Sequence, residues 1–292
     1  MLLLQLLVDG AVSGCAVGVV AITFAYVYAT TGVFHVAHAG LFTLGGYIAW
    51  WLSGQGLPFP LALMGAVAVG AAVGAVMQKA IYETLMKRRA SPLVQLIASL
   101  GLLAILQNLV ALLFTPNMLQ FEAVSWRLSM LDIGPIHLSL PQIWTLASSL
   151  AILAGLVLFS TRTILGKRIR AVSSNRALAE ITRLRPFDVY VVVVAIASGL
   201  VAVPSVFIGV DQAMQPYTSV LVLLTAVIAV IAGGIGSLPG AFIISVVLAV
   251  LQNLVLALMP GRWSIAFTFM LFIVFILIKP TGLFQTRLKR AS

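Results

Sequence analysis

Apolar stretches of about 20 residues recur along almost the whole chain, and this recurrence limits the possible fold more than any other feature. A membrane-spanning helix needs roughly 20 mainly apolar residues. Only 8% of the 292 residues are charged, compared with roughly 25% in soluble domains. The sequence therefore predicts an all-α polytopic membrane protein with eight or nine transmembrane helices. The candidate spans are 6–30, 37–53, 57–80, 93–114, 140–161, 188–209, 217–235, 239–259 and 263–279.

Basic residues gather in three clusters, at 87–89, 162–186 and 287–290. The segment 162–186 holds seven basic residues and one acidic residue, a net charge of +6 in a chain whose formal net charge is +10. Loops rich in Lys and Arg stay on the cytoplasmic side of a membrane. Because even numbers of predicted spans separate the clusters, we expect all three, and the C-terminus with them, to be cytoplasmic. The segment 115–139 then faces outward.

A break in the helical pattern is predicted at 30–40, TTGVFHVAHAG, where Gly40, His35 and His38 lie between two apolar runs. Irregular backbone at membrane depth is tolerated only where it is buried in protein or lines a water-filled cavity. Nine full spans would place the N-terminus outside. A re-entrant element at 30–40 would leave eight crossings and place it inside. The pattern favours a broken or re-entrant element.

The sequence Leu-Gln-Asn-Leu-Val occurs twice, at 106–110 and 251–255. A parallel duplication would explain the repeat, and a chance match between leucine-rich helices is the alternative. Each copy carries an amide pair, and buried amides cost free energy unless they are hydrogen-bonded. These pairs therefore either hold helices together or line a polar path.

Glycines mark two further places in the chain. Gly10, Gly14 and Gly18 recur every four residues on one helical face, a spacing that permits close approach of helix backbones in lipid. This approach is either packing within the chain or a subunit contact. The stretch 232–241, AGGIGSLPGA, is predicted to be a turn on the cytoplasmic side. It is either a tight hairpin or a hinge or path element, because its glycines permit backbone conformations closed to other residues.

Residues that carry catalysis are few. His35 and His38 lie three apart, but no carboxylate or cysteine accompanies them, and a metal site needs further ligands. The stretch at 166–168, Gly-Lys-Arg, lacks the other residues of a nucleotide-binding loop. The single cysteine, Cys15, excludes an internal disulfide. We therefore expect no catalytic residue, no metal, no cofactor and no nucleic-acid partner.

The acidic residues all fall near predicted membrane ends or in loops. Proton or sodium coupling usually leaves an acidic residue within a span, so ion-coupled transport is poorly supported. A transporter without an internal energy source takes its energy from a partner or acts as a passive pore.

The segment 162–186 is the only predicted cytoplasmic segment long enough to dock a soluble partner. We expect Gly166 to end the preceding span and a short helix to follow over 166–181. Arg170 and Arg176 would pair with acidic residues of the partner. The alternative is that these arginines only anchor topology and face phospholipid head groups.

One side of this predicted helix suits a groove on a soluble domain. On a 3.6-residue period, Ala171, Asn175 and Leu178 fall on that side. Their side chains are small or apolar, so a docked partner would contact them closely.

Several motifs follow the order of one known family along almost the whole length. They are Gly32 to Ala37-His38, Ser91-Pro92-Leu93 with Leu100-Gly101 and Leu106-Gln107-Asn108, Gly166 with Arg170-Ala171 and Asn175, Gly233-Gly234-Ile235-Gly236-Ser237, Pro239-Gly240-Ala241 and Pro280-Thr281-Gly282. The glycine-rich stretch is the most specific. In this ordered set the chain resembles the permease subunits of ABC importers for branched-chain amino acids, of the LivH type.

The chain also departs from that family's pattern. His35 stands in place of the usual Asn, and Ala39 and Gly40 stand in place of Gly and a frequent Glu. In the basic segment, Arg183 replaces a common Gly, and Leu178 replaces one Ala of an Ala-Ala pair. The first set of differences is compatible with a substrate other than leucine-like amino acids, because amide and urea importers share this architecture.

The resemblance implies one permease domain over 1–292 in the inner membrane, with 162–186 as its coupling segment. It implies a subunit without its own ATPase site, which imports branched-chain or other amino acids. Its partners would be a second permease subunit, as a homologous heterodimer partner, two ATP-binding cassette subunits, an extracytoplasmic solute-binding protein and membrane lipid. A permease for amides or urea is the alternative, and a passive channel or secondary carrier is the rival class.

Two groups of residues are the functional candidates. Those for the translocation path and helix break are His35, His38, Gly40, Gln107, Asn108, Gly233, Gly234, Gly236, Gln252 and Asn253. Those for coupling to the ATPases are Gly166, Arg170, Ala171, Asn175, Leu178 and Ala179.

Overall fold

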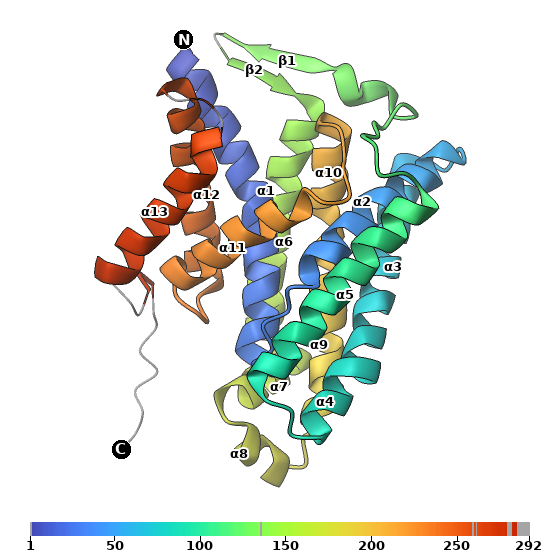
Figure 1. Cartoon of the computed structure of the whole chain (residues 1–292), viewed down its shortest axis with the longest axis vertical. Coiled ribbons are helices and arrows are strands. Elements are labelled where there is room, and N and C mark those ends of the chain that lie inside the picture. The colour runs from blue at the N-terminus through green and yellow to red at the C-terminus, as the bar shows by residue number, and fades with distance from the viewer. Residues whose placement is uncertain (1, 135, 259, 261, 279–281, 285–292) are drawn as a thin grey trace.

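The structure is a computed structural model that describes residues 2–134, 136–258, 260, 262–278 and 282–284. It is a helical bundle with one small β-hairpin (Figure 1). The basic cluster at 287–290 lies outside the described residues. In chain order the elements are α1 (Leu2–Thr31), α2 (His38–Gly54), α3 (Phe59–Met77), η1 (Gln78–Tyr82), α4 (Glu83–Lys87), α5 (Pro92–Leu113), η2 (Ser125–Leu128), β1 (Met130–Ile133), β2 (Ile136–Ser139), α6 (Leu140–Arg162), α7 (Ile164–Ser174), α8 (Arg176–Ile181), α9 (Pro186–Leu200), α10 (Ala202–Asp211), α11 (Ser219–Gly233), α12 (Leu238–Leu258) and α13 (Arg262–Ile278).

The predicted all-α membrane fold is confirmed, but the number of spans is not. Among the described residues, six helical runs are long and apolar enough to cross a membrane. They are α1, α3 with η1 and α4, α5, α6, α9 with α10, and α12. The other three predicted spans correspond to shorter helices, since α2 and α13 have 17 residues each and α11 has 15.

Local sequence signals explain several helix boundaries. Ser139 caps α6 through a reciprocal pair of hydrogen bonds with Gln142, the capping-box arrangement. Pro92 and Pro186 occupy the first positions of α5 and α9, where the missing N–H costs nothing. Pro204 lies in the first turn of α10. A proline there removes one helical hydrogen bond, which explains why α9 and α10 are separate around Val201.

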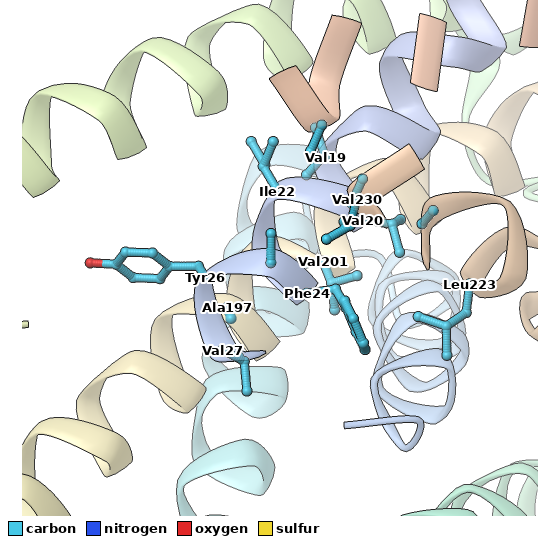
Figure 2. Packing of buried hydrophobic residues seen from close by; sticks show 14 of the residues in the cluster. Val19, Val20, Ile22, Phe24, Tyr26, Val27, Ala197, Val201, Leu223 and Val230 are labelled. Atoms are coloured by element: carbon cyan, nitrogen blue, oxygen red, sulfur yellow. The ribbon is translucent and has the colours of Figure 1, made fainter. Parts of the chain in front are cut away.

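Helix α1 runs through the middle of the bundle, between α12 and α11 on one side and α6, α9 and α10 on the other (Figure 1). Its side chains form the centre of the main hydrophobic core. Figure 2 shows Val19, Val20 and Phe24 of α1 close to Leu223 and Val230 of α11. Because α1 contacts so many elements, its position determines how the other helices pack around the core.

The glycine face of α1 packs against α12. A Cβ atom added at Gly10 would lie 2.7 Å from the Cα of Val250, and one added at Gly14 would lie 2.5 Å from the Cα of Val246. Gly18 faces the ring of Phe242 in the same way. The pairing 10 to 250, 14 to 246 and 18 to 242 is antiparallel. The predicted close approach is therefore packing within the chain.

The two ends of the bundle differ in character. The hairpin β1–β2 and the N-terminus lie at one end, and α4, α7 and α8 lie at the other (Figure 1). The side-chain amide of Gln5 joins the start of α1 to the hairpin. Its Nε2 donates to the carbonyl of His137 at 2.9 Å, and its Oε1 accepts from that residue's N–H at 3.0 Å. The N-terminus and 115–139 therefore share one end, and the basic segments 87–89 and 162–186 share the other.

We expect Gly14→Ala to destabilise the protein, because the added methyl group forces α1 and α12 apart, and overpacking of this kind costs about 1–3 kcal/mol. Gly155 of α6 is the matched control, since nothing lies within 4 Å of a Cβ added there. Alanine is favoured over glycine by about 1 kcal/mol in an open helix, so Gly155→Ala should keep or raise the Tm. Thermal unfolding of the detergent-purified variants measures both. An unchanged Tm for Gly14→Ala would contradict the close packing.

Candidate functional site

The chain leaves helical structure between α1 and α2, where a break was predicted. Residues 32–37 are irregular, and Gly32 has a φ of +73°, a conformation that favours glycine. A short turn then leads into α2, with the N–H of His38 donating to the carbonyl of His35 at 3.1 Å. His35 and His38 are 1% and 0% exposed. The break is therefore enclosed by protein.

A chain of hydrogen bonds holds His35 at the break. Its Nδ1 lies 2.8 Å from the hydroxyl oxygen of Tyr82, which in turn donates to Oγ of Ser99 at 2.9 Å. The same Oγ accepts from the backbone N–H of Ala37 at 3.0 Å, the residue that precedes the first turn of α2. Side chains from η1 and α5 thus satisfy polar groups of the break that would otherwise be unpaired in an apolar interior.

His38 is held by α1. Its Nε2 lies 2.9 Å from Oγ1 of Thr23, and that hydroxyl is within 2.7 Å of the carbonyl of Val19 and 3.1 Å of that of Val20. A carbonyl can only accept, so the hydroxyl proton of Thr23 is used there. His38 must therefore donate from Nε2, which leaves its Nδ1 as an acceptor.

Three buried polar groups near the break have no hydrogen-bond partner among the described residues. They are Nε2 of His35, Nδ1 of His38 and the side-chain amide of Gln78. The two imidazole rings are 5.6 Å apart between centroids. No group of three or more His, Cys, Asp or Glu side chains that could hold a metal ion occurs in the part of the chain that the structure describes.

A second polar cluster joins α2, α5 and α11. Oγ of Ser219, at the start of α11, accepts from Oγ1 of Thr43 at 2.7 Å and from Nε2 of Gln107 at 3.2 Å. Thr43 also lies 3.1 Å from the carbonyl of Pro216. Gly40 lies on the same helix as Thr43, and a Cβ added to it would meet Leu106 at 2.9 Å. The structure therefore brings the first turns of α2, which follow the break, next to the first amide pair on α5.

The two amide pairs bond in the same pattern. Gln107 bonds to a hydroxyl of α11, and Gln252 donates to Oγ1 of Thr268 in α13 at 2.5 Å. Asn108 and Asn253 each donate to the alanine carbonyl four residues earlier, at 2.8 and 3.0 Å. Each glutamine thus joins two helices. The asparagines differ in surroundings, since Asn108 is exposed and Asn253 lines a polar cavity of about 290 Å³ with Asp9, Gln142 and Asp211.

The glycine-rich turn between α11 and α12 is tightly packed. A Cβ on Gly233 would lie 2.6 Å from the backbone of Gly240, and Gly234 and Gly236 have φ values of 102° and 104°. The carbonyls of Ala232 and Gly233 accept from the N–H groups of residues 283 and 284 at 2.8 and 3.1 Å. This turn therefore needs its glycines for close approach and for positive φ.

The glycine-rich turn was predicted to lie on the cytoplasmic side. The structure places it some distance from the end of the bundle that carries the basic segments. Because α12 packs antiparallel to α1, with Phe242 beside Gly18, its first residue Leu238 lies level with about Ile22. Helix α1 continues for nine further residues to Thr31, about 13 Å at 1.5 Å per residue. The turn thus stops well short of the end of the bundle that carries α7 and α8.

The predicted single helix over 166–181 is wrong, because the segment forms two helices. Asn175 adopts an extended conformation, with φ −155° and ψ 103°, between α7 and α8. Its side-chain oxygen accepts from the N–H of Leu178 at 3.0 Å, so it caps the second helix. Asparagine competes with helical hydrogen bonding in this way, which a 3.6-residue pattern does not register.

Gly166 does not end the preceding span, because α6 ends at Arg162 and Gly166 lies in the first turn of α7. A side chain there would collide with the backbone of Phe159 and Ser160. Gly166 therefore allows α7 to fold back against the end of α6.

The remaining coupling candidates divide by exposure. Arg170, Ala171, Asn175 and Leu178 are exposed, whereas Ala179 is buried. Ala179 belongs to a small hydrophobic cluster shared by α7, α8 and α9, so it packs these helices together and does not face a partner. The exposed residues form the surface that is open to a partner.

Arg176 is already engaged within the chain. Its Nε lies 3.1 Å from Oε1 of Glu180, and its guanidinium carbon lies 5.1 Å from the centre of the Phe187 ring. The Nζ of Lys87 lies 5.4 Å from the same ring. Arg176 already pairs with Glu180, so Arg170 is better placed than Arg176 to pair with acidic residues of a partner.

The sequence did not reveal the hydroxyl partners of the predicted histidines and glutamines, which are Thr23, Tyr82, Ser219 and Thr268. The available signal was weak. Hydroxyl-bearing residues are common in membrane helices, where they often bond to their own backbone.

An apolar bundle with a helix break lined by buried polar side chains, and with basic segments exposed at one end, is an arrangement typical of a membrane transport subunit. A family model for the branched-chain amino acid transport system / permease component matches residues 6–276, and the chain belongs to this family. It is therefore a multi-pass ABC-transporter permease subunit, and separate subunits hydrolyse ATP.

Curated relatives match over nearly the whole length. The chain is 28% identical to the high-affinity branched-chain amino acid transport system permease protein BraD of Pseudomonas aeruginosa, over 96% of the chain and 95% of the relative. It is 25% and 24% identical to the LivH proteins of Salmonella typhimurium and Escherichia coli, over 96% of the chain and 94% of each relative.

A solved structure shares the fold. It is PsaBC from Streptococcus pneumoniae in complex with Fab, with a TM-score of 0.53 and 17% sequence identity over 93% of this chain and 91% of that chain. At this identity the likeness concerns the fold alone.

Proposed function

We propose that this chain is the translocating subunit of an ATP-driven importer for branched-chain or other amino acids. The single observation that carries the substrate class is the match to branched-chain amino acid permease proteins over 96% of the chain. The departures at His35, Ala39 and Gly40 keep amides or urea as the second candidate, because these residues are buried at the break and in the first turn of α2. A passive channel or secondary carrier would need no ATPase partner.

The proposed assembly contains a second, homologous permease subunit, two ATP-binding cassette subunits and an extracytoplasmic solute-binding protein, in the lipid of the inner membrane. Residues 1–292 act in it as one permease domain. The family match and the shared fold support this composition. Exposed apolar side chains on several helices, such as Leu112 and Leu158, supply surface for lipid and for the second permease.

We place ATPase docking on the exposed surface of α7 and α8. Besides Ala171 and Asn175, this surface carries Leu178 and Ile181, which are 58% and 79% exposed. Large apolar side chains at such exposure, in a segment otherwise rich in Arg and Lys, fit a groove on a soluble domain better than they fit water. Arg170 adds a charge that acidic residues on the rim of the groove would pair.

We assign the buried candidates and the accessible candidates different parts in translocation. His35, His38 and Gln107 are buried and hydrogen-bonded, which suits control of helix position. Asn108 and Asn253 are open to a solute, the first by exposure and the second in the polar cavity. The packed glycine turn serves to fix α11 against α12.

Uptake by the reconstituted complex tests the substrate class. With ATP inside the liposomes and the binding protein outside, we expect ATP-dependent uptake of radiolabelled leucine. Excess unlabelled isoleucine or valine should compete, and excess urea or acetamide should not. Competition by urea or acetamide alone would favour the second candidate. ATP-independent uptake would support the passive channel or carrier.

Cysteine labelling tests the orientation, in which the basic segments and the C-terminus are cytoplasmic. In a Cys15→Ala background, Ser174→Cys should resist a membrane-impermeant maleimide in intact cells and react after permeabilisation. Asn117→Cys is the control at the hairpin end, and it should react in intact cells. Both residues are exposed. Ready labelling of Ser174→Cys from outside would invert the proposed topology.

Ala171→Trp tests the docking surface. The change keeps every positive charge, so a mere topology anchor should tolerate it, whereas a docked surface should lose its fit. We expect normal membrane insertion, loss of the ATPase subunits on purification, and at least about tenfold less substrate-stimulated ATP hydrolysis, as for truncation of an interface hot spot.

Ala123→Trp is the matched control for this variant. Ala123 is also exposed but belongs to the segment at the hairpin end of the bundle, so this variant should keep the ATPase subunits. Wild-type transport by Ala171→Trp would show that docking occurs elsewhere.

A further inference from the structure

We propose that the helix break at 32–37 is the part of this chain that the ATPase subunits move, and that Ser173 and Tyr82 are the positioning residues that transmit the movement. The inference rests on the proposed docking of those subunits at α7 and α8. Two independent sets of hydrogen bonds carry it, one on each side of the break.

The first set joins α7 to the end of α1. The last carbonyls of a helix have no partner within that helix. Here the carbonyl of Tyr28 accepts from the N–H of Gly32 at 2.9 Å, and the carbonyl of Ala29 accepts from Oγ of Ser173 at 2.6 Å. Ser173 lies two residues after Ala171 on the proposed docking helix. A displacement of α7 therefore acts directly on the last turn of α1, which leads into the break.

The second set joins η1 to both the break and α2. The hydroxyl oxygen of Tyr82 lies 2.8 Å from Nδ1 of His35 and 2.9 Å from Oγ of Ser99. That Oγ also accepts from the N–H of Ala37 at the start of α2. Tyr82 is thus a shared partner of the break and of the hydroxyl that holds α2. It ends a π-helical turn, a feature frequent at functional sites.

The helix that follows Tyr82 leads to the docking segment. Helix α4 has five residues and ends at Lys87. The Nζ of Lys87 and the guanidinium of Arg176 from α8 both contact the Phe187 ring. Met86 packs against the buried cluster shared by α7, α8 and α9. A shift of α8 thus reaches Tyr82 through one short helix. Figure 1 shows α4, α7 and α8 together at the end of the bundle below α1.

The polar character of these contacts makes them suited to transmission. Hydrogen bonds are directional. Those of Tyr82 and Ser99 are also buried, so a partner left unpaired there is costly, whereas the bond of Ser173 to Ala29 is exposed. Apolar contacts are non-directional, whereas a shift of Ala29 relative to Ser173, or of His35 relative to Tyr82, loses a hydrogen bond. The break therefore follows α7 and η1 when these elements move.

Tyr82→Phe is the first test, with Tyr47→Phe as its control. Both tyrosines are 1% exposed, but the Tyr47 hydroxyl has no hydrogen-bond partner among the described residues. The measurement is the amount of solute imported per ATP hydrolysed by the reconstituted complex. We expect Tyr82→Phe to retain the ATPase subunits and to lower this ratio about fivefold or more, and Tyr47→Phe to leave it unchanged. A wild-type ratio for Tyr82→Phe would overturn the role of Tyr82.

Ser173→Ala is the second test, with the neighbouring and exposed Ser174→Ala as its control. Val36→Cys, in a Cys15→Ala background, reports on the break through its rate of reaction with a maleimide. We expect trapping with ATP and vanadate to change this rate roughly threefold or more, as for a shift between two conformations. Ser173→Ala should remove most of the change, and Ser174→Ala should preserve it. An unchanged rate on trapping in the otherwise wild-type complex would overturn the movement of the break.

The two proposals fail in different ways. Retention of the ATPase subunits by Ala171→Trp would remove the docking on which the inference rests. With docking intact, a wild-type import ratio in Tyr82→Phe together with a preserved rate change in Ser173→Ala would overturn the transmission alone. If Tyr82→Phe does not assemble, the Ser173 pair of variants decides, because that side chain is exposed and needs no core rearrangement.

Discussion

The close antiparallel packing of α1 against α12 is the contact on which the other features of this structure depend. Because Gly10, Gly14 and Gly18 present no side chain, the two backbones approach within the distance of a Cβ atom. In lipid, where apolar side chains gain little by leaving their surroundings, such van der Waals contact is a main source of helix association. It sets α1 in the middle of the bundle, so the end of α1 and the break that follows it lie inside protein. Polar groups of that break then need partners from other elements, and the hydroxyl groups of Tyr82 and Ser99 supply them to the imidazole of His35 and the N–H of Ala37.

Hydropathy predicted where most helices lie, since each of the nine proposed spans matches a helix or a pair of helices within a few residues. It could not predict features that arise from single backbone hydrogen bonds. The split of 166–181 depends on one asparagine that caps α8, and the π-helical turn before α4 leaves no mark in composition. The hairpin formed by β1 and β2 was also not predicted, because strands of four residues each are too short to show a clear alternating pattern. The position of the N-terminus became clear only through Gln5 and His137, which lie 132 residues apart.

The sequence predicted the residues of the candidate site that are rare in apolar stretches, and it did not predict the common residues that bond to them. Two histidines in an apolar stretch stand out in any sequence, and both proved to be buried at the break. Their partners, Thr23 and Tyr82, are ordinary residues for a membrane helix, and Tyr82 lies 47 positions from His35. Pairing at that distance depends on how α2 and η1 pack, which no local pattern encodes. The prediction that Gly166 ends the preceding span was wrong for a related reason. A glycine near a helix end suggests a stop, but here it serves the close contact of α7 with α6.

A permease that holds its moving part by hydrogen bonds differs physically from one held by apolar packing. Apolar contacts are non-directional, so they specify the relative position of two elements less sharply than hydrogen bonds do. A buried hydrogen bond is either made or unmade, and in a low-dielectric interior the unmade state is expensive. At this break the imidazole of His35 and the N–H of Ala37 are bonded to buried side chains of other elements, and the carbonyl of Ala29 is bonded to the exposed side chain of Ser173. The segment therefore has few positions in which all three bonds survive. That property favours two discrete arrangements over gradual deformation, which is what alternating access between the two sides of a membrane requires.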